Sequence, residues 1–230
     1  MKSRKPAAYA TLFPEEKRTL MDRHLHDAIP VARSPVETSI GASRVFVALI
    51  VQTALLLVTM RVADATGGLR SALPIWVWGP MDSLFHGIIA ALIVWPMVRL
   101  SPRAGWRTLI VAGAVGSLID IDHFIAAGSF SFDEAIALGC RPWTHSLTFA
   151  ALCGLITWII GREGRAGLIV MVALASHVIR DAAGGCTPWL FPLPLRGIPR
   201  WTYVVATLVL GWMVTLMAPR LARIDRGALE

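Results

Sequence analysis

Apolar residues occur in long runs separated by short polar segments over most of the chain, and polar residues dominate only the first 44 positions. A helix that crosses the hydrocarbon core of a bilayer needs about 20 mostly apolar residues. Six runs approach that length, and we predict a transmembrane helix at each: 45–63, 80–98, 109–127, 144–160, 166–181 and 203–217. The pattern therefore predicts an all-α fold, a polytopic membrane helical bundle with about six transmembrane helices.

The same pattern divides the chain into three parts. Residues 1–44 are expected to form a basic cytoplasmic leader with a short helix at 13–29, residues 45–218 the transmembrane bundle, and residues 219–230 a cytoplasmic tail. No cleavable apolar stretch lies within the first thirty residues, so we expect the first internal apolar run to anchor the chain.

Composition and charge agree with a membrane protein. The 230 residues are 55% hydrophobic and only 16% charged, with a mean hydropathy of +0.61, and a soluble chain of this size could not bury so much apolar surface. Sixteen of the 22 basic residues lie in the N-terminal segment, the second and fourth loops and the C-terminal segment. The positive-inside rule therefore predicts cytoplasmic termini in a bacterial-type inner membrane, and the net charge of +7 indicates anionic lipid rather than nucleic acid.

Ionisable residues are concentrated in the predicted spans, although each costs at least about 2.5–3.5 kcal/mol on insertion. Four spans place them in the outer half of the bilayer, at Asp82 and His86, at Asp120, Asp122 and His123, at His145, and at His177 and Asp181. Zinc binds imidazole nitrogen and carboxylate oxygen, and a buried group of carboxylates needs compensating positive charge. The mixture predicts one to three divalent cations, zinc first, because it is too rich in histidine for calcium or magnesium.

The motifs in this region have a recognisable order and spacing: Asp120-Ile121-Asp122-His123, Arg141-Pro142-Trp143-Thr144-His145-Ser146-Leu147, Ser176-His177, Asp181 and Thr187-Pro188-Trp189. Over residues 80–195 the chain resembles the YdjM-like family of membrane-bound metal-dependent hydrolases, whose metal motifs resemble those of helical zinc-dependent phospholipase C. The resemblance implies a metal hydrolase. It also implies that the following residues are metal ligands or lie close to the metal: His86, Asp120, Asp122, His145, His177 and Asp181.

The leading functional hypothesis is an integral-membrane, zinc-dependent hydrolase that cleaves a phosphoester of a lipid or lipid-linked substrate at the outer face. Bound zinc lowers the pKa of water to about 7, and Asp120 or Asp122 is a candidate general base. Lipid esters and amides remain alternative substrates, because zinc also activates water toward carbonyl groups. A proton or metal-ion transporter and a haem-binding electron carrier are the other classes that an intramembrane histidine cluster allows.

Several neighbouring residues have a supporting role or a purely structural one. His123 can orient a metal ligand, and Asp82 suits the first turn of a helix. Thr144 and Ser146 flank His145 as candidate substrate contacts, although Thr144 is equally placed to cap the fourth span. Basic residues at the outer surface can bind a substrate phosphate or lipid headgroups without selectivity: Arg141, Arg180, Arg196 and Arg200.

Two cysteines lie on the predicted outer side, close to the motifs. Cys140 precedes His145 by five residues, and Cys186 follows Asp181 by five. In an oxidising compartment they can form a disulfide that joins the two motif loops. Free thiols and a soft metal ligand are the alternatives.

Overall fold

The computed structural model describes residues 35–100, 105–193 and 197–227, in which the regular elements are helices. The fold class predicted from the hydrophobic pattern, an all-α membrane helical bundle, is confirmed. The predicted leader helix at 13–29 and the candidate Arg196 lie outside the described residues.

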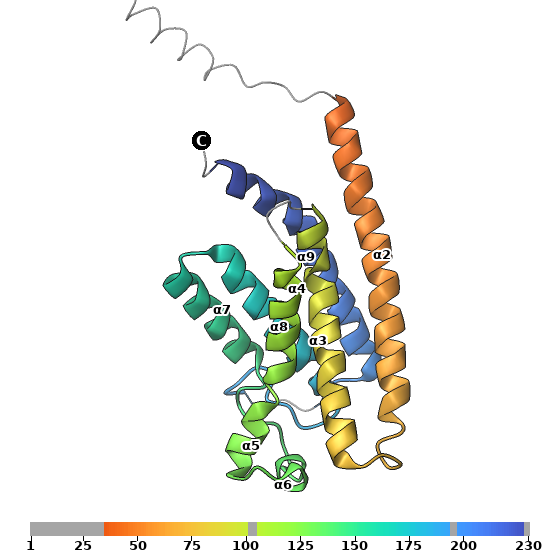
Figure 1. The fold of residues 1–230 in the computed structure, drawn as a ribbon, viewed down its shortest axis with the longest axis vertical. Helices are drawn as coiled ribbons and strands as arrows, with labels where there is room; N and C mark the ends of the chain where they lie inside the picture. The colour runs from red at the N-terminus through yellow and green to blue at the C-terminus, as the bar shows by residue number, and fades with distance from the viewer. Residues whose placement is uncertain (1–34, 101–104, 194–196, 228–230) are drawn as a thin grey trace, which may run out of the picture. The chain divides into compact units, whose positions relative to one another are not determined.

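The chain divides into two compact units, Met1–Ala42 and Ser43–Glu230. Helix α2 is Pro35–Gly67 (Figure 1), and its residues from Ser43 onward belong to the second unit. The remaining helices all belong to the second unit: α3 (Ile75–Leu100), α4 (Arg107–Leu118), α5 (Ile121–Ala127), α6 (Phe132–Ile136), α7 (Leu147–Gly161), α8 (Gly164–Ala182) and α9 (Arg200–Gly227).

Four helical stretches among the described residues are long and apolar enough to cross a membrane: Gly41–Gly67, Ile75–Leu100, Arg107–Ala127 and Arg200–Leu221. About six spans are predicted from the sequence, and four stretches of the described residues meet the length and composition of a span. Helix α7 has 15 residues, about 22 Å at 1.5 Å per residue, which is short of a hydrocarbon core of about 30 Å. Helix α8 has 19 residues but carries three charged ones, Arg165, Arg180 and Asp181.

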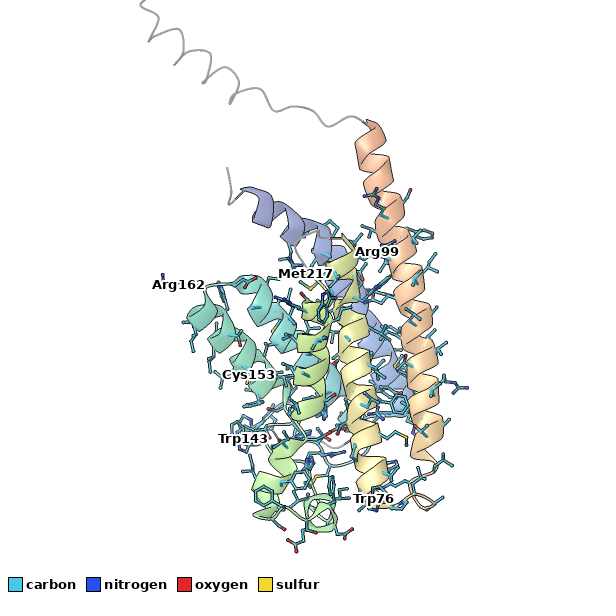
Figure 2. The ribbon with its side chains drawn as sticks, viewed as in Figure 1. Trp76, Arg99, Trp143, Cys153, Arg162 and Met217 are labelled. Atoms are coloured by element: carbon cyan, nitrogen blue, oxygen red, sulfur yellow. A yellow bond between two sulfur atoms is a disulfide. The ribbon has the colours of Figure 1, made fainter. Side chains whose placement is uncertain are left out.

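Helices α7 and α8 instead form a hairpin, whose second helix, α8, packs against α3, α4 and α9. Figure 2 shows Arg162, at the turn of the hairpin, towards the end of the bundle marked by Arg99. Trp143, just before α7, lies towards the opposite end, marked by Trp76 at the start of α3. The hairpin therefore leaves the Trp76 end and returns to it, and the polar motifs that flank it are brought to one level.

A buried glutamine joins three of the long helices. The side-chain amide of Gln52 in α2 donates to the carbonyls of Leu92 and Ile93 in α3, at 3.1 and 3.0 Å, and its oxygen accepts from Thr215 in α9 at 2.7 Å. Pro96 explains the need for this contact, because proline has no N–H to donate to the carbonyl of Leu92 four residues earlier. Gln52 thus satisfies a backbone acceptor that lipid could not.

Helices α3 and α4 approach backbone to backbone at glycines. A Cβ atom on Gly116 would lie 2.7 Å from the Cβ of Ala90 and 3.3 Å from the carbonyl oxygen of His86. Small residues permit such close packing in membranes, where van der Waals contact drives helix association. This contact fixes α4 against α3 just before the segment that carries Asp120.

Gly116→Ala is expected to lower the free energy of unfolding by about 1–3 kcal/mol, because the added methyl must displace a buried neighbour. The measurement is denaturant unfolding of the detergent-solubilised protein. Gly161→Ala is the matched control, since a Cβ there meets nothing within 4 Å. Equal stability of the two variants would contradict the tight contact.

Candidate metal centre

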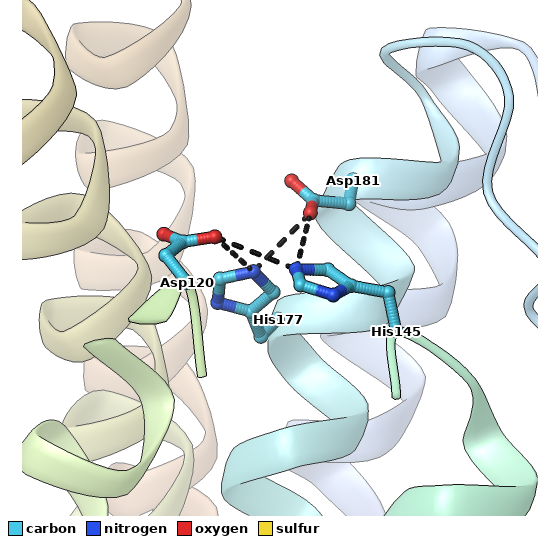
Figure 3. A group of neighbouring side chains, drawn as sticks. All are labelled: Asp120, His145, His177 and Asp181. Carbon is cyan, nitrogen blue, oxygen red and sulfur yellow. Dashed lines mark hydrogen bonds and ion pairs between the residues drawn. The ribbon is translucent and has the colours of Figure 1, made fainter. Parts of the chain in front are cut away.

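Four side chains from three separate segments converge at the Trp76 end of the bundle. Asp120 lies between α4 and α5, His145 lies in the loop before α7, and His177 and Asp181 occupy successive turns of α8. One ligand atom from each lies within 4.8 Å of the others, and Figure 3 shows the four side chains pointing toward one another. The structure therefore brings together residues that are up to 61 positions apart.

A break in the third predicted span places two aspartates around one histidine. Helix α4 ends at Leu118 and α5 begins at Ile121. Oδ1 of Asp120 lies 3.4 Å from Nε2 of His145, and Oδ2 of Asp122 lies 3.0 Å from Nδ1 of the same ring. Residues i and i+2 of an unbroken helix do not face the same neighbour, so the break is what allows both contacts.

The distances among the four donors match a tetrahedral zinc site. Nε2 of His145 and of His177 each lie 3.2–3.4 Å from Oδ1 of Asp120 and Oδ2 of Asp181. Zinc–nitrogen and zinc–oxygen bonds of about 2.0–2.1 Å predict a donor separation of about 3.3–3.4 Å at tetrahedral angles. The residues present therefore fit the metal that the motifs predict.

Hydrogen bonds fix which nitrogen of each histidine faces the centre. Nδ1 of His177 lies 2.7 Å from the carbonyl oxygen of Gly116, and Nδ1 of His145 lies 3.0 Å from Oδ2 of Asp122. Both partners are acceptors, so Nδ1 carries the proton and the lone pair of Nε2 points at the centre. This arrangement, a histidine held through its other nitrogen, is typical of metal sites.

The two carboxylates are held in a similar way. Ser83 in α3 donates to Oδ2 of Asp120 at 2.6 Å. Nε2 of His86 lies 3.3 Å from Oδ1 of Asp181, and Nε of Arg141 lies 3.3 Å from Oδ2 of the same carboxylate. Each aspartate that faces the centre is therefore oriented by a second side chain.

Arg141 remains charged at the edge of this cluster. Burial disfavours its charged form, but the carboxylates of Asp181 and Asp120 outweigh burial and raise the pKa of the guanidinium. Its Nη1 lies 2.8 Å from Nε2 of His123 and donates to it, because arginine has no acceptor.

Some predicted residues contact the four donors instead of joining them. The ring of His86 stacks on that of His177, with centroids 3.7 Å apart. Asp122 accepts hydrogen bonds from Thr144 and His145, and it joins His123 and His145 in a second group able to hold a metal.

Other candidates have structural contacts. Asp82 is paired with Arg180. Ser146 caps α7 by accepting from the backbone N–H of Phe149 at 3.1 Å. The alternative that Thr144 is the cap is therefore corrected, since its hydroxyl donates to Asp122.

Two groups that hold the donors, the Ser83 hydroxyl and the Gly116 carbonyl, leave no signal in the sequence pattern. Ser83 directly follows Asp82 in the sequence, but nothing in the sequence pattern relates Ser83 to Asp120, 37 residues later. The carbonyl of Gly116 carries no side-chain signal at all. Both contacts exist only because α3, α4 and α8 pack together.

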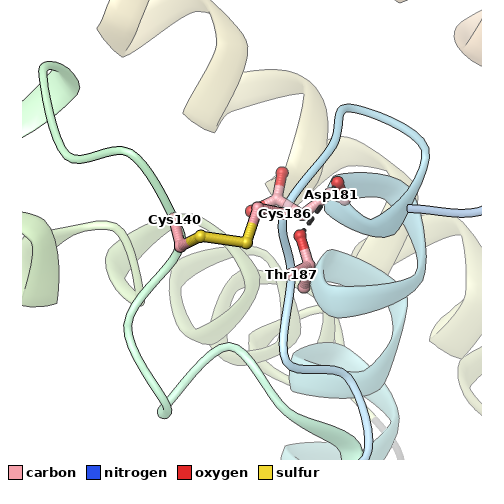
Figure 4. The surroundings of a disulfide bond; sticks show 4 residues. All are labelled: Cys140, Asp181, Cys186 and Thr187. Carbon is pink, nitrogen blue, oxygen red and sulfur yellow. Dashed lines mark hydrogen bonds between the residues drawn. A yellow bond between two sulfur atoms is a disulfide. The ribbon is translucent and has the colours of Figure 1, made fainter. Parts of the chain in front are cut away.

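A disulfide joins the two loops beside the centre. Cys140 and Cys186 are bonded, with Cα atoms 4.8 Å apart, and the backbone N–H of Arg141 donates to the carbonyl of Cys186 at 2.9 Å. Figure 4 shows the bond next to Asp181 and Thr187, whose hydroxyl donates to the carbonyl of Asp181. The loop that carries His145 is thus tied to the end of α8.

A cavity of about 540 Å³ opens from this cluster. Its polar side is formed by Asp120, His123, Arg141 and Asp181, and apolar residues form another side. Two of the four donors, Asp120 and Asp181, therefore border a space that a small molecule or part of a larger one can enter.

The helices and this buried cluster define a multi-pass membrane protein with a candidate metal centre. The chain belongs to the YdjM inner membrane protein family, whose sequence profile matches residues 81–228. Every donor of the cluster lies within that match.

Among curated proteins the chain is similar to vertebrate proteins named transmembrane protein 267. The zebrafish (Danio rerio) protein is 32% identical over 152 residues, covering 62% of this chain and 68% of the relative. The mouse (Mus musculus) protein is 28% identical over 144 residues, covering 59% and 66%. The alignments thus span about two thirds of these relatives. No solved structure matches the chain.

Asp122→Asn is expected to weaken zinc binding about 10- to 100-fold while leaving a measurable site, because Asp122 orients His145 and is not one of the four donors. His145→Ala is expected to abolish binding. Zinc titration of the purified protein against a competing chelator measures both. Complete loss of zinc in Asp122→Asn would instead make Asp122 a ligand.

Proposed function

We propose that this protein is an integral-membrane, zinc-dependent hydrolase that cleaves a phosphoester of a lipid or lipid-linked substrate with a metal-activated water. The observation that carries the proposal is the buried set of two imidazoles and two carboxylates with zinc-like spacing. Zinc bound there would supply Lewis acidity and lower the pKa of water to about 7.

Three of the four donors are assigned to permanent metal binding. Catalytic zinc sites use three protein ligands, such as two histidines and a carboxylate, and keep a further position for water or substrate. His145, His177 and Asp181 form such a set. The side chain of Asp181 is only 4% exposed, and both histidines are fully buried.

Asp120 is assigned the role of general base. Its side chain is 26% exposed and lines the cavity, so water and substrate can reach it. The hydrogen bond from Ser83 to Oδ2 leaves Oδ1 directed at the centre, where it can accept a proton from water. Asp122, the other candidate, already accepts from Thr144 and His145 and does not line the cavity.

Arg141 is assigned to the substrate phosphate. Its guanidinium lines the cavity beside the donors, and the raised pKa of the group keeps it charged. A planar guanidinium suits bidentate recognition of phosphate oxygens. This positive charge favours a phosphoester over the ester and amide alternatives.

The core beyond the centre favours a hydrolase over a transporter. A transporter needs polar groups throughout the depth of the bilayer. From Ile89 to Met97 the buried residues of α3 are apolar, Gln52 and Thr215 hydrogen-bond to each other, and the other buried polar side chain of α9, Thr207, is not ionisable. Metal or proton flux in liposomes that His177→Ala abolishes would reverse this preference.

Asp120→Asn is expected to keep its zinc and to lower turnover of phosphatidic acid in mixed micelles at least about 100-fold, because it removes a general base. Asp181→Asn is expected to lose both zinc and turnover. A chelator should inactivate the wild type, and added zinc should restore it.

Asp133→Asn is the matched control, because Asp133 is an exposed residue of α6 outside the cavity lining. It is expected to match the wild type in zinc content and turnover. Full activity of zinc-free wild-type protein would overturn the proposal.

We further propose that the centre faces the oxidising outer side of the membrane and that the termini are cytoplasmic. The disulfide between Cys140 and Cys186 supports this orientation, because structural disulfides persist outside the cytosol. The basic turn of the α7–α8 hairpin, with Arg162 and Arg165, suits the opposite side.

In intact cells, a membrane-impermeant maleimide is expected to label Cys140 and Cys186 after reduction, in a Cys153→Ser background. A cysteine introduced at the hairpin turn by Arg162→Cys should react only after permeabilisation. The reverse pattern of labelling would invert the orientation.

A further inference from the structure

We infer that the substrate reaches the centre sideways from the bilayer, between α3 and the α4–α5 segment, with its hydrocarbon chain in an apolar groove. The inference rests on the proposed function and specifies its substrate class: an amphiphile whose phosphate lies directly beside a long apolar chain. The observation behind it is that one cavity is lined both by residues of the candidate metal centre and by an apolar wall.

The apolar wall begins beside the donors. Leu84 of α3 and Leu118 of α4 line the cavity, and each is adjacent in sequence to a serine of the centre's hydrogen-bond network. Ile121 and Phe124 of α5 and Phe132 of α6 continue the wall away from Asp120. A chain attached to a phosphate at the centre would therefore leave it along apolar side chains.

This wall reaches the surface at membrane depth. The exposed fraction of both Leu84 and Leu118 is 58%, although both also line the cavity. Leu84 lies nine residues from the start of the candidate span Ile75–Leu100, about 14 Å along α3. Leu118 lies near the same level, because the neighbouring Ser117 donates to the carbonyl of Ser83. We place their exposed surface in the hydrocarbon of the bilayer, which gives the cavity an apolar rim there.

The rest of the cavity rim is formed by loop residues instead of apolar helix side chains. Arg70, Gly139 and Gly184 are exposed and line the cavity at the loops that follow the helix ends. Arg70 lies over the ring of Trp78, 4.7 Å from its centroid. Water and a polar product have this route, so the hydrocarbon chain and the water do not compete for one opening.

The seam between α3 and α4 closes on the other side of the centre. A Cβ on Gly87 would lie 2.2 Å from Oγ of Ser117, and one on Gly116 would lie 2.7 Å from Cβ of Ala90. No chain can pass between backbones that close. The groove therefore runs from the centre toward α5 and α6, away from the tightly packed half of the bundle.

The test compares two tryptophan substitutions on α4. Leu118→Trp narrows the groove, whereas Ile110→Trp changes a lipid-facing residue of nearly equal exposure, 57%, that does not line the cavity. For Leu118→Trp, we expect the ratio of kcat/KM for a long-chain alkyl phosphate to that for its short-chain, water-soluble analogue to fall about tenfold. Ile110→Trp should keep the wild-type ratio, and both variants should keep their zinc.

An equal ratio in Leu118→Trp and Ile110→Trp, with zinc retained, would overturn lateral entry. Leu84→Trp repeats the test from the α3 side if Leu118→Trp does not fold. If the wild type hydrolyses neither phosphate, the proposed function fails. A second measurement, which needs no turnover, then decides whether an acyl chain occupies the groove.

That measurement is photo-crosslinking of the zinc-loaded wild type in vesicles of phosphatidylcholine and phosphatidic acid, the latter with a diazirine in its acyl chain. Adducts are expected to be enriched on Leu84, Leu118, Phe124 and Phe132 over Ile110. Adducts spread evenly over the lipid-facing residues would contradict the groove.

Discussion

The structure depends on the burial of charge in a medium of low dielectric constant. Asp181, His145 and His177 are almost completely removed from solvent, and Asp120 is only partly exposed. Carboxylates in such surroundings are costly unless positive charge and hydrogen bonds compensate them. A divalent cation held by His145, His177 and Asp181, as proposed above, would provide that charge, and Arg141 provides more at the edge. Ser83, His86, Asp122 and the Gly116 carbonyl each contact one of the four side chains that face the centre.

The four side chains are carried partly by backbone outside the regular helices. Between α4 and α5 the helix is interrupted at Ile119 and Asp120, although both residues keep right-handed helical angles, and His145 lies in a loop close to the Cys140–Cys186 disulfide. Such segments are tolerated at membrane depth when protein or a water-filled cavity surrounds them. The close glycine contacts between α3 and α4 and the disulfide hold these irregular segments in place. The site is thus precise because rigid helices and a covalent bond support its loops.

The α7–α8 hairpin explains how a short, partly polar segment fits in a membrane protein. Its two helices pack closely, with Gly154 and Gly167 allowing backbone contact. Both open ends of the hairpin lie at the level of the centre, so it delivers His145 from one side and His177 with Asp181 from the other. A pair of full-length spans is not needed for this purpose.

The amino-acid sequence alone determined the helical class, the positions of the helices and the residue types of the centre. It could do so because a bilayer demands long apolar runs and makes every ionisable residue within them conspicuous. Residue spacing also placed His177 and Asp181 on one face of a helix. Only the tertiary structure decided that Asp120, His145, His177 and Asp181 meet, that Asp122 contacts Nδ1 of His145, and that Ser83 and the Gly116 carbonyl hydrogen-bond to Asp120 and His177. Those outcomes depend on helix packing and on a break of two residues, which are set by contacts between segments far apart in the chain and leave no local pattern.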